Sequence, residues 1–324
     1  MSEKNVPLIK TVALKKYFQT PRGLLHAVDG IDLSIFSGET LGVVGESGCG
    51  KSTLGRTILR LVPHTSGDIF YDGESIIRKN ANEMRRMRQK MQIIFQDPYS
   101  SLDPRMTVSD LISEYMLVNR TYSTRAAVQA ETKKLMDIVG LASRFADAYP
   151  HELDGGRRQR IGIARALSLN PQFIVCDEPV SALDVSIQAQ ILNLLIDIQK
   201  ERGLSYLFIT HNLSVVKHIS DKIAVMYLGK CVELAPSDEL FQNPRHPYTK
   251  ALLDAIPVPD IRMRDREIRT ISGEVSNPIN PKPGCRFAAR CSHCHDKCRE
   301  IDPEFQEVGP DHFAACWLME RQDG

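Results

Sequence analysis

The chain has 324 residues, of which 41 are basic and 40 acidic, and this balance gives no electrostatic reason to expect nucleic acid as the partner. Its length is sufficient for one large or two modest domains. No run approaches the roughly 18 consecutive apolar residues that span a bilayer, and the first residues lack an apolar signal region. We therefore expect a soluble, cytosolic chain, and any membrane spans that it works with must belong to another polypeptide.

The first part of the chain alternates between apolar and polar positions. Over residues 8–44 this alternation, interrupted by turn residues at 21–23 and 37–38, predicts antiparallel strands paired across both turns. The run at 40–44 has the apolar character of a short buried strand, and a helix is expected from Lys51 onward.

Further along, the periodicity becomes helical and then returns to short apolar runs. Residues 97–166 form an inserted helical region, with helices expected at 108–118, 125–139 and 157–169. The apolar runs at 173–176 and 206–209 resemble buried parallel strands, joined by a helix over residues 186–200. These elements predict an α/β core, and frequent prolines after residue 243 predict a loop-rich tail.

A glycine-rich run between the expected strand and helix has the spacing of a phosphate-binding loop. Residues 45–52 read G-x-x-x-x-G-K-S. The glycines let the backbone turn tightly, so that its N–H groups point at phosphate oxygens beside the positive end of the helix. Lys51 is expected to reach the β- and γ-phosphates, and the Ser52 hydroxyl to bind Mg²⁺. The residues expected to contact ATP here are Gly45, Glu46, Ser47, Gly48, Cys49, Gly50, Lys51, Ser52 and Thr53.

An acidic pair, Asp177 and Glu178, follows the apolar run at 173–176. A carboxylate at the end of a buried strand can hold Mg²⁺ through its water shell, and a second one beside it can polarise a water toward the γ-phosphate. The pair could instead merely cap the strand. With a phosphate loop upstream, we favour the catalytic interpretation.

The ordered set of motifs resembles the ATP-binding-cassette (ABC) ATPases over roughly residues 8–255. Besides the loop and the acidic pair, the set comprises Gln96 after Ile-Ile-Phe, the run Leu-Asp-Gly-Gly-Arg-Arg-Gln-Arg at 153–160, Ser-Ala-Leu-Asp at 181–184, and His211. The resemblance implies an α/β P-loop NTPase with an N-terminal antiparallel β subdomain, a helical subdomain at about 97–166, and a small loop-rich, cysteine-containing C-terminal domain. The nucleotide-binding domain is expected over 1–255 and the C-terminal extension over 256–324.

The same resemblance implies roles for single residues. Gln96 would contact the metal and the attacking water, and His211 would contact the γ-phosphate; together with Glu178 these are the expected catalytic residues. Mg²⁺ would be held through Ser52, Gln96 and Asp177. Asp184 would communicate across a dimer. Either Phe18 or Tyr17 would stack on adenine, and position alone does not choose between them.

The signature segment, residues 153–157, departs from the family pattern Leu-Ser-Gly-Gly-Gln. In the family, its Ser and glycine N–H groups grip the γ-phosphate of ATP bound to the other subunit, a role that falls here to Asp154, Gly155 and Gly156. Asp154 removes a donor and adds like-charge repulsion, at a cost of about 1–3 kcal/mol or more, which Arg157 and Arg158 could partly offset. Asp154 could also be only a helix N-cap. We expect a heterodimer with a second ATPase subunit that has an intact signature.

The end of the chain narrows the family further. The run Asn-Pro-Arg-His-Pro-Tyr-Thr-Lys-Ala-Leu-Leu at 243–253 looks like the extension of ATPases from oligopeptide and dipeptide importers, with nickel importers as close relatives. The cysteines Cys285, Cys291, Cys298 and Cys316 resemble the end of the same subfamily, and they are expected to bind a [4Fe–4S] cluster, with Zn²⁺ as the alternative. Cys294, His293 and His295 are expected to be bystanders, although Cys294 could replace Cys285 or Cys316. Unligated buried cysteines are the remaining alternative.

We therefore interpret the chain as the peripheral ATPase subunit, on the cytoplasmic side of the membrane, of an ABC importer for dipeptides or oligopeptides. Its cofactors would be ATP and Mg²⁺. Its partners would be the second ATPase subunit, two transmembrane permease subunits and, through the complex, an extracytoplasmic solute-binding protein, with no nucleic acid. The alternatives are the ATPase of a nickel or other small-solute importer, a subunit that binds ATP but hardly hydrolyses it, and a non-transport ABC ATPase.

Overall fold

The computed structural model describes residues 6–256 and 278–322, apart from the side chains of Pro98, Arg321 and Gln322. The chain divides into two compact units. The first unit comprises Met1–Ile35, Thr40–Ile77 and Thr210–Gly324, and the second comprises Phe36–Glu39 and Arg78–Ile209. Among the described residues, no helix combines the length and the apolar character needed to cross a membrane.

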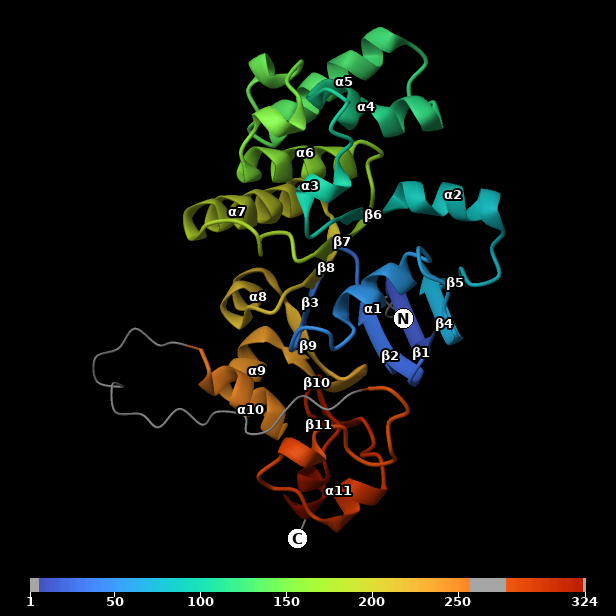
Figure 1. Cartoon of the computed structure of the whole chain (residues 1–324), viewed down its shortest axis with the longest axis vertical. Coiled ribbons are helices and arrows are strands. Elements are labelled where there is room, and N and C mark those ends of the chain that lie inside the picture. The colour runs from blue at the N-terminus through green and yellow to red at the C-terminus, as the bar shows by residue number, and fades with distance from the viewer. Residues whose placement is uncertain (1–5, 257–277, 323–324) are drawn as a thin grey trace, which may run out of the picture. The chain divides into compact units, whose positions relative to one another are not determined.

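An antiparallel sheet lies at the start of the first unit (Figure 1). Its strand order is β2-β1-β4-β5, with bounds β1 (Ile9–Thr20), β2 (Gly23–Ile35), β4 (Ser66–Tyr71) and β5 (Glu74–Ser75). β1 and β2 form a hairpin in which Thr20 pairs with Gly23. The expected α/β class, N-terminal antiparallel strands and first turn are confirmed.

The pairing predicted across the turn at 37–38 is wrong. β3 (Thr40–Val44) leaves the antiparallel sheet and pairs in parallel with β9 (Lys222–Tyr227). The physical reason is burial on both faces: every residue of β3 is buried, as in the interior of a parallel sheet, whereas the antiparallel strands alternate.

The remaining strands of the first unit extend the sheet away from β3, in the order β9, β10, β12, β11. They are β10 (Lys230–Pro236), β12 (His312–Ala314) and β11 (Gln306–Gly309), all joined by antiparallel pairs. The helices are α1 (Lys51–Ile58), α8 (Leu213–Ile219), α9 (Ser237–Gln242), α10 (Pro247–Asp254) and α11 (Asp296–Glu300), with 3₁₀ turns at Ala288–Arg290 and Trp317–Gln322. The tail therefore contains short regular elements as well as loops.

The second unit is built on three parallel strands and a group of helices. β6 (Met91–Ile94), β7 (Phe173–Asp177) and β8 (Ser205–Ile209) pair side by side, and the last two are buried throughout. The helices are α2 (Ala81–Lys90), α3 (Pro98–Ser101), α4 (Val108–Asn119), α5 (Arg125–Ile138), α6 (Gly155–Leu167) and α7 (Val185–Arg202), with 3₁₀ turns at Ser143–Phe145 and Pro150–Glu152. α4, α5 and α6 pack on one another (Figure 1), and their apolar faces, with Leu111, Leu135 and Ile161 fully buried, provide the stabilisation.

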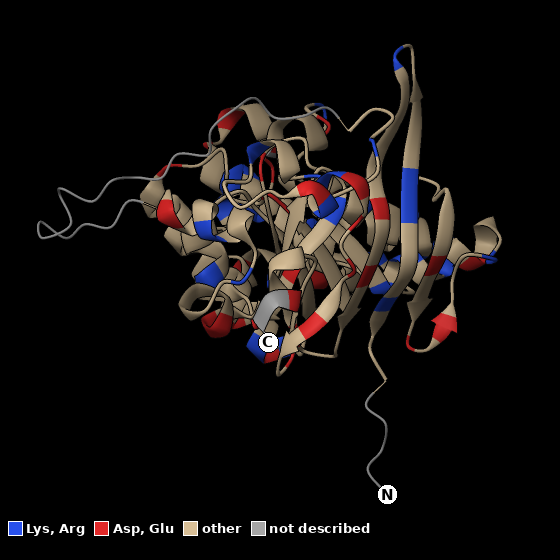
Figure 2. Ribbon diagram, turned by 90° about the horizontal axis from the view of Figure 1, so that it is seen from below, with Lys and Arg blue, Asp and Glu red and all other residues tan. Residues whose placement is uncertain are grey.

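Positions of Lys and Arg are interspersed with positions of Asp and Glu along the ribbon (Figure 2). This mixture of signs agrees with the net charge of +1.

Candidate functional site

The loop at 45–52 lies between β3 and α1, in the strand-loop-helix setting that its sequence predicts. Gly45 and Gly50 have φ values of +151° and +106°, which side chains of L-residues rarely adopt. A Cβ on Gly45 would lie 2.1 Å from the carbonyl oxygen of Met226, and a Cβ on Gly50 would lie 1.9 Å from that of Ala27. Glycine is therefore required at both positions for torsion and for space.

Lys51 opens α1, and its side chain lies within the loop. It is 4% exposed, and its Nζ donates hydrogen bonds to the carbonyl oxygens of Gly45 (2.8 Å) and Glu46 (3.0 Å). Gly50, the N-cap of α1, makes no side-chain capping hydrogen bond, and the N-terminus of a helix favours an anion. Ser52 and Thr53 follow in the same turn, both partly exposed. The loop thus offers backbone donors and one ammonium group to a phosphate.

The acidic pair lies in the second unit, at the end of β7. Asp177 is its last residue and is fully buried, and Glu178 follows with a φ of +48°. This left-handed conformation costs a non-glycine residue about 1–2 kcal/mol, and the hydrogen bond from Glu178 N–H to the carbonyl of Ile209 (2.9 Å) helps to hold it. Gln96 Nε2 donates to Glu178 Oε2 at 2.9 Å. The structure therefore brings the expected base and the expected water-contacting amide together.

The other candidates occupy separate places. His211 belongs to the first unit, where it is exposed just before α8. Asp184, in the second unit, caps α7 by accepting from Ile187 N–H at 3.0 Å. The phosphate loop and the acidic pair lie in different units, and their joint action on one nucleotide stays a prediction.

The signature segment forms a capped helix start. Asp154 is the N-cap of α6, and its Oδ1 accepts from Arg157 N–H at 2.8 Å, as the N-cap alternative predicted. Its Oδ2 pairs with the Arg157 guanidinium at 2.6 Å, so that side chain does offset the charge. Arg158 instead donates to the Pro150 carbonyl. A Cβ on Gly156 would lie 2.8 Å from Ile187, so glycine is required for close packing on α7.

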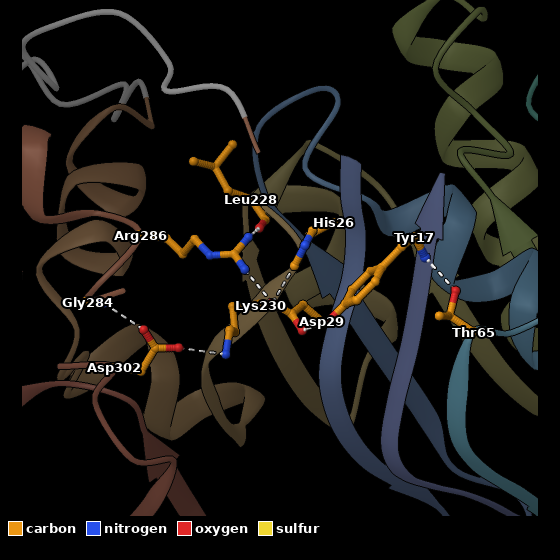
Figure 3. A network of polar contacts seen from close by, with 9 residues as sticks. All are labelled: Tyr17, His26, Asp29, Thr65, Leu228, Lys230, Gly284, Arg286 and Asp302. Carbon is orange, nitrogen blue, oxygen red and sulfur yellow. Dashed lines mark hydrogen bonds and ion pairs between the residues drawn. The ribbon is translucent and has the colours of Figure 1, made fainter. Parts of the chain in front are cut away.

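A polar network surrounds Asp29 in β2 (Figure 3). Tyr17, one of the two adenine candidates, stacks on His26 at 3.8 Å between ring centroids and donates its hydroxyl to Asp29 at 2.5 Å. Arg286 donates to Asp29 and to the Leu228 carbonyl (2.6 Å). Burial acts to raise the pKa of Asp29, but hydrogen bonds from Tyr17 and His26, with nearby cationic charge, hold it below its usual value. Tyr17 is thus held by His26 and Asp29 of β2, and the C-terminal Arg286 binds the same Asp29, a connection that the sequence did not predict.

The other adenine candidate, Phe18, carries the Lys16 ammonium over its ring at 4.5 Å. The structure therefore gives each aromatic residue a definite neighbour. The choice between them stays open.

Several C-terminal cysteines surround one small cavity. The four thiols that line the cavity belong to Cys285, Cys291, Cys298 and Cys316, whereas Cys294 does not line it. His293, which was expected to be a bystander, also lines the cavity. All eight cysteines of the chain are unpaired. Burial, together with the other thiols nearby, raises the pKa of Cys285 to about 12 and of Cys316 to about 11. These thiols stay protonated near neutral pH unless a cation stabilises the thiolates.

This donor set can be tested for its fit to a metal. Within residues 6–256 and 278–322, no three His, Cys, Asp or Glu side chains converge closely enough to hold a single ion. A tetrahedral zinc site needs such convergence, with sulfur about 2.3 Å from the metal, whereas a polynuclear cluster binds its thiolates at separate corners. Four thiols around one cavity are the donor type of a thiolate-bound metal centre, so the residues present fit such a group in their chemistry.

Two side chains that the sequence motifs did not single out reach the phosphate loop. Tyr248 of α10 accepts a hydrogen bond from Glu46 N–H at 2.9 Å through its hydroxyl. Arg290 forms an ion pair with the Glu46 carboxylate at 2.8 Å. Both residues stand inside runs quoted for the resemblance, but their pairing spans more than 200 residues and has no signal in local spacing.

A phosphate loop between strand and helix, an acidic pair ending a second buried strand, and a glycine-rich helix start define a P-loop ATPase of the ABC class. Comparison with known proteins agrees with this class. The ABC transporter family matches residues 28–181, and the oligopeptide/dipeptide transporter C-terminal region matches residues 232–298. The chain belongs to the family of ABC transporter ATP-binding proteins, in the group that carries this C-terminal region.

Individual relatives match over nearly their whole length. The oligopeptide transport ATP-binding protein OppF of Bacillus subtilis is 49% identical over 98% of this chain and 97% of its own. The dipeptide transport ATP-binding protein DppF of Escherichia coli is 45% identical over 98% of this chain and 96% of its own. Among solved structures, the ATP-binding cassette MJ0796, a dimer bound to ADP and phosphate, aligns with a TM-score of 0.66 at 26% identity, over 71% of this chain and 98% of its own. These matches confirm the family and the ABC ATPase fold.

Proposed function

We propose that this chain hydrolyses ATP to drive the import of dipeptides or oligopeptides. The observation that carries the proposal is the C-terminal region at 232–298, which matches the region named for oligopeptide and dipeptide transporters. The near full-length likeness to peptide transport ATP-binding proteins supports it. The solute itself is bound by other subunits of the complex.

Transport by the assembled complex tests this proposal. The complex is purified with its copurifying subunits, reconstituted, and supplied with labelled dipeptides, longer peptides or Ni²⁺. We expect ATP-dependent uptake of peptide, abolished by Lys51→Ala. Uptake of Ni²⁺ alone would reject peptide import and favour the nickel alternative, and a purified assembly without membrane subunits would favour a non-transport ATPase.

Different residues of this chain have different roles in ATP hydrolysis. In this proposal the loop amides and Lys51 hold the ATP phosphates, and Phe18 or Tyr17 packs on adenine. Mg²⁺, held through Ser52, Gln96 and Asp177, would neutralise charge on the phosphates. Glu178 polarises the attacking water, which Gln96 orients, and His211 donates to the γ-phosphate as its negative charge develops.

The assembly that we propose is a heterodimer of ATPase subunits on the cytoplasmic side of the membrane, bound to two permease subunits and served by an extracytoplasmic solute-binding protein. The dimeric structure of MJ0796 supports a pair of cassettes. The carboxylate of Asp154 at the start of α6 supports unequal partners, because an intact Ser-containing signature would complete the site at this chain's own loop.

Disabling the two catalytic carboxylates separately in the complex tests this asymmetry. Glu178→Gln should keep ATP binding but remove most of the hydrolysis, by roughly 100-fold at this chain's loop. The same change in the partner should remove much less. Equal losses, or full activity from this chain as a homodimer, would show that Asp154 is harmless.

We further propose that Cys285, Cys291, Cys298 and Cys316 bind a [4Fe–4S] cluster, with Zn²⁺ as the alternative. The arrangement of these thiols around one cavity supports the set, and Cys294, which lies outside the cavity, provides a matched control. Anaerobically purified protein should contain iron and absorb visible light, and Cys291→Ser should lose both while Cys294→Ser keeps them. Zinc without iron in elemental analysis would reject the cluster.

A further inference from the structure

Arg290 connects the thiol cavity to the phosphate loop. Its Nη1 donates to Glu46 Oε2 at 2.8 Å and its Nη2 to Glu46 Oε1 at 3.1 Å, so the ion pair is bidentate. The Arg290 side chain is 7% exposed and that of Glu46 is 23% exposed. A bidentate pair shielded from water is stronger and geometrically more specific than an exposed ion pair, so it fixes the direction of the Glu46 side chain.

The surroundings of Arg290 are rigid. Its Nη1 also contacts the Tyr227 hydroxyl at 3.3 Å, and Tyr227 packs edge-on against both Tyr248 and Phe287, with ring centroids 4.6 and 5.2 Å away. Tyr248 holds the backbone N–H of Glu46. Both the side chain and the backbone of this loop residue are therefore held by one aromatic cluster and one arginine.

Arg290 directly precedes the cavity-lining Cys291 in the chain, and its N–H donates to the Phe287 carbonyl at 2.9 Å. It ends the 3₁₀ turn Ala288–Arg290, in which Ala288 N–H donates to the Cys285 carbonyl at 2.9 Å and Cys291 N–H to the Ala288 carbonyl at 3.4 Å. Cys285 and Cys291 line the cavity on either side of this turn. A change at the cavity that moves the backbone of Cys285 or Cys291 would therefore also move the turn that carries Arg290.

We propose that Arg290 is a positioning residue of the phosphate loop, through which the thiol cavity sets the affinity of the loop for ATP. The inference rests on the proposed function, since it takes ATP as the ligand of the loop. It adds that the C-terminal cavity is coupled to the nucleotide site. Coupling free energies between sites commonly correspond to about 5- to 150-fold changes in affinity. Because the coupling here passes through one ion pair, we expect a change at the lower end of that range.

The first test measures ATP affinity and hydrolysis of the full chain in its complex. Arg290→Ala should weaken ATP binding by about 5- to 30-fold and raise KM more than it lowers kcat, because the loop is displaced while Glu178 is untouched. Arg290→Lys should restore part of the affinity, since an ammonium keeps the charge but not the bidentate geometry. The control is Arg299→Ala, an exposed arginine of α11, which should bind ATP as the wild type does.

Lys51→Ala separates the possible failures. If Lys51→Ala binds ATP normally, the assignment of the loop itself is wrong. If Lys51→Ala is impaired while Arg290→Ala matches the wild type, only the coupling is overturned. Equal losses in Arg290→Ala and Arg299→Ala would show a general disturbance of the C-terminal region, and would also overturn it.

Two double-mutant cycles decide whether the cavity acts through this arginine. Glu46→Gln and Arg290→Ala break the same pair, so their effects on ATP affinity should not add. Cys291→Ser should weaken ATP binding in the wild type but have little further effect in Arg290→Ala. An equal, additive effect of Cys291→Ser in both backgrounds would mean that the cavity and the loop are independent, whatever either one binds.

Discussion

Two helices of the described chain, α1 and α6, begin at glycine-rich segments that we expect to meet phosphate, and they differ in how the N-cap is filled. At α1 the N-cap is Gly50, which carries no side chain and makes no side-chain capping hydrogen bond. At α6 the N-cap is Asp154, whose carboxylate already accepts from the Arg157 N–H and pairs with its guanidinium. The first helix start therefore has no side-chain cap, whereas the second has a carboxylate as its cap.

This difference shows how one local motif can serve structure or ligand binding. A carboxylate N-cap stabilises a helix by about 1 kcal/mol and satisfies a donor that a phosphate would otherwise use. A glycine N-cap leaves the helix end dependent on its surroundings. Around α1 those surroundings are supplied by backbone contacts of Gly45 and Gly50 and by the C-terminal residues that hold Glu46.

The largest effect is expected from substituting Gly50, the N-cap of α1, because the backbone of this residue lies close to that of Ala27. Gly50→Ala places a Cβ 1.9 Å from the Ala27 carbonyl oxygen at a φ of +106°, and should lower the free energy of unfolding by about 3 kcal/mol or more. Gly48→Ala is the matched control, because its Cβ would meet nothing within 4 Å and only the torsional cost of about 1–2 kcal/mol remains. Denaturant unfolding measures the stability of both variants. Equal losses in their free energies of unfolding would contradict a loop held by close backbone contact.

The next largest effect is expected on the pH dependence of stability, through His246, which lies beside the residue Tyr248 that binds the phosphate loop. His246 caps α10, one residue before Pro247, and is 1% exposed, with its Nδ1 accepting from Tyr248 N–H at 3.1 Å. Burial lowers its pKa to about 4 from an ordinary value near 6.5, despite the opposing charge of Glu233. Because the folded pKa lies below the unfolded one, the folded state binds fewer protons. The contribution of neutral His246 to the free energy of unfolding is therefore complete above about pH 6.5 and is lost as the pH falls toward 4.

The corresponding loss of stability is at most about 3 kcal/mol, from 2.5 pKa units at 1.36 kcal/mol each. Unfolding of the wild type between pH 7 and 4 should show this slope, and His246→Asn should flatten it, since Asn also caps a helix but does not titrate. An unchanged slope in His246→Asn would show that other groups cause the acid sensitivity.

What the sequence predicts well in this chain is what depends on neighbours along the chain. The phosphate loop was predictable because three glycines, Lys51 and Ser52 lie within eight residues, and glycine is the one residue that tolerates those torsions. The strand ending at Asp177 was predictable from its continuous apolar run. The left-handed conformation of Glu178 was not, because it depends on the Ile209 carbonyl.

Contacts between segments far apart in the sequence could not be predicted from local sequence patterns. The partner of β3 is β9, about 180 residues away, and the direction of that pairing depends on burial of both faces. The Arg290–Glu46 pair spans 244 residues, and either residue alone has the appearance of an ordinary surface charge. Charge and spacing suggested that Arg157 could compensate Asp154, and in that case the two residues are close enough in one helix turn for the pair to form.

The smallest effect is expected from converting the second helix start toward the first. Asp154→Ser keeps a capping oxygen for the Arg157 N–H and loses only an exposed ion pair, with the two side chains 57% and 44% exposed, so the stability should change by less than about 0.5 kcal/mol. In the proposed heterodimer, the same change would remove a negative charge and restore a hydroxyl donor at the site that we expect α6 to form with the phosphate loop of the second ATPase subunit. Measured in a Glu178→Gln background, where the other site is silent, hydrolysis there should rise several-fold. Asp154→Asn separates the two contributions, since it removes the charge without restoring the hydroxyl and should give a smaller rise. If neither variant changes the rate, the carboxylate does not face the nucleotide in the working complex, and the two helix starts differ in capping alone.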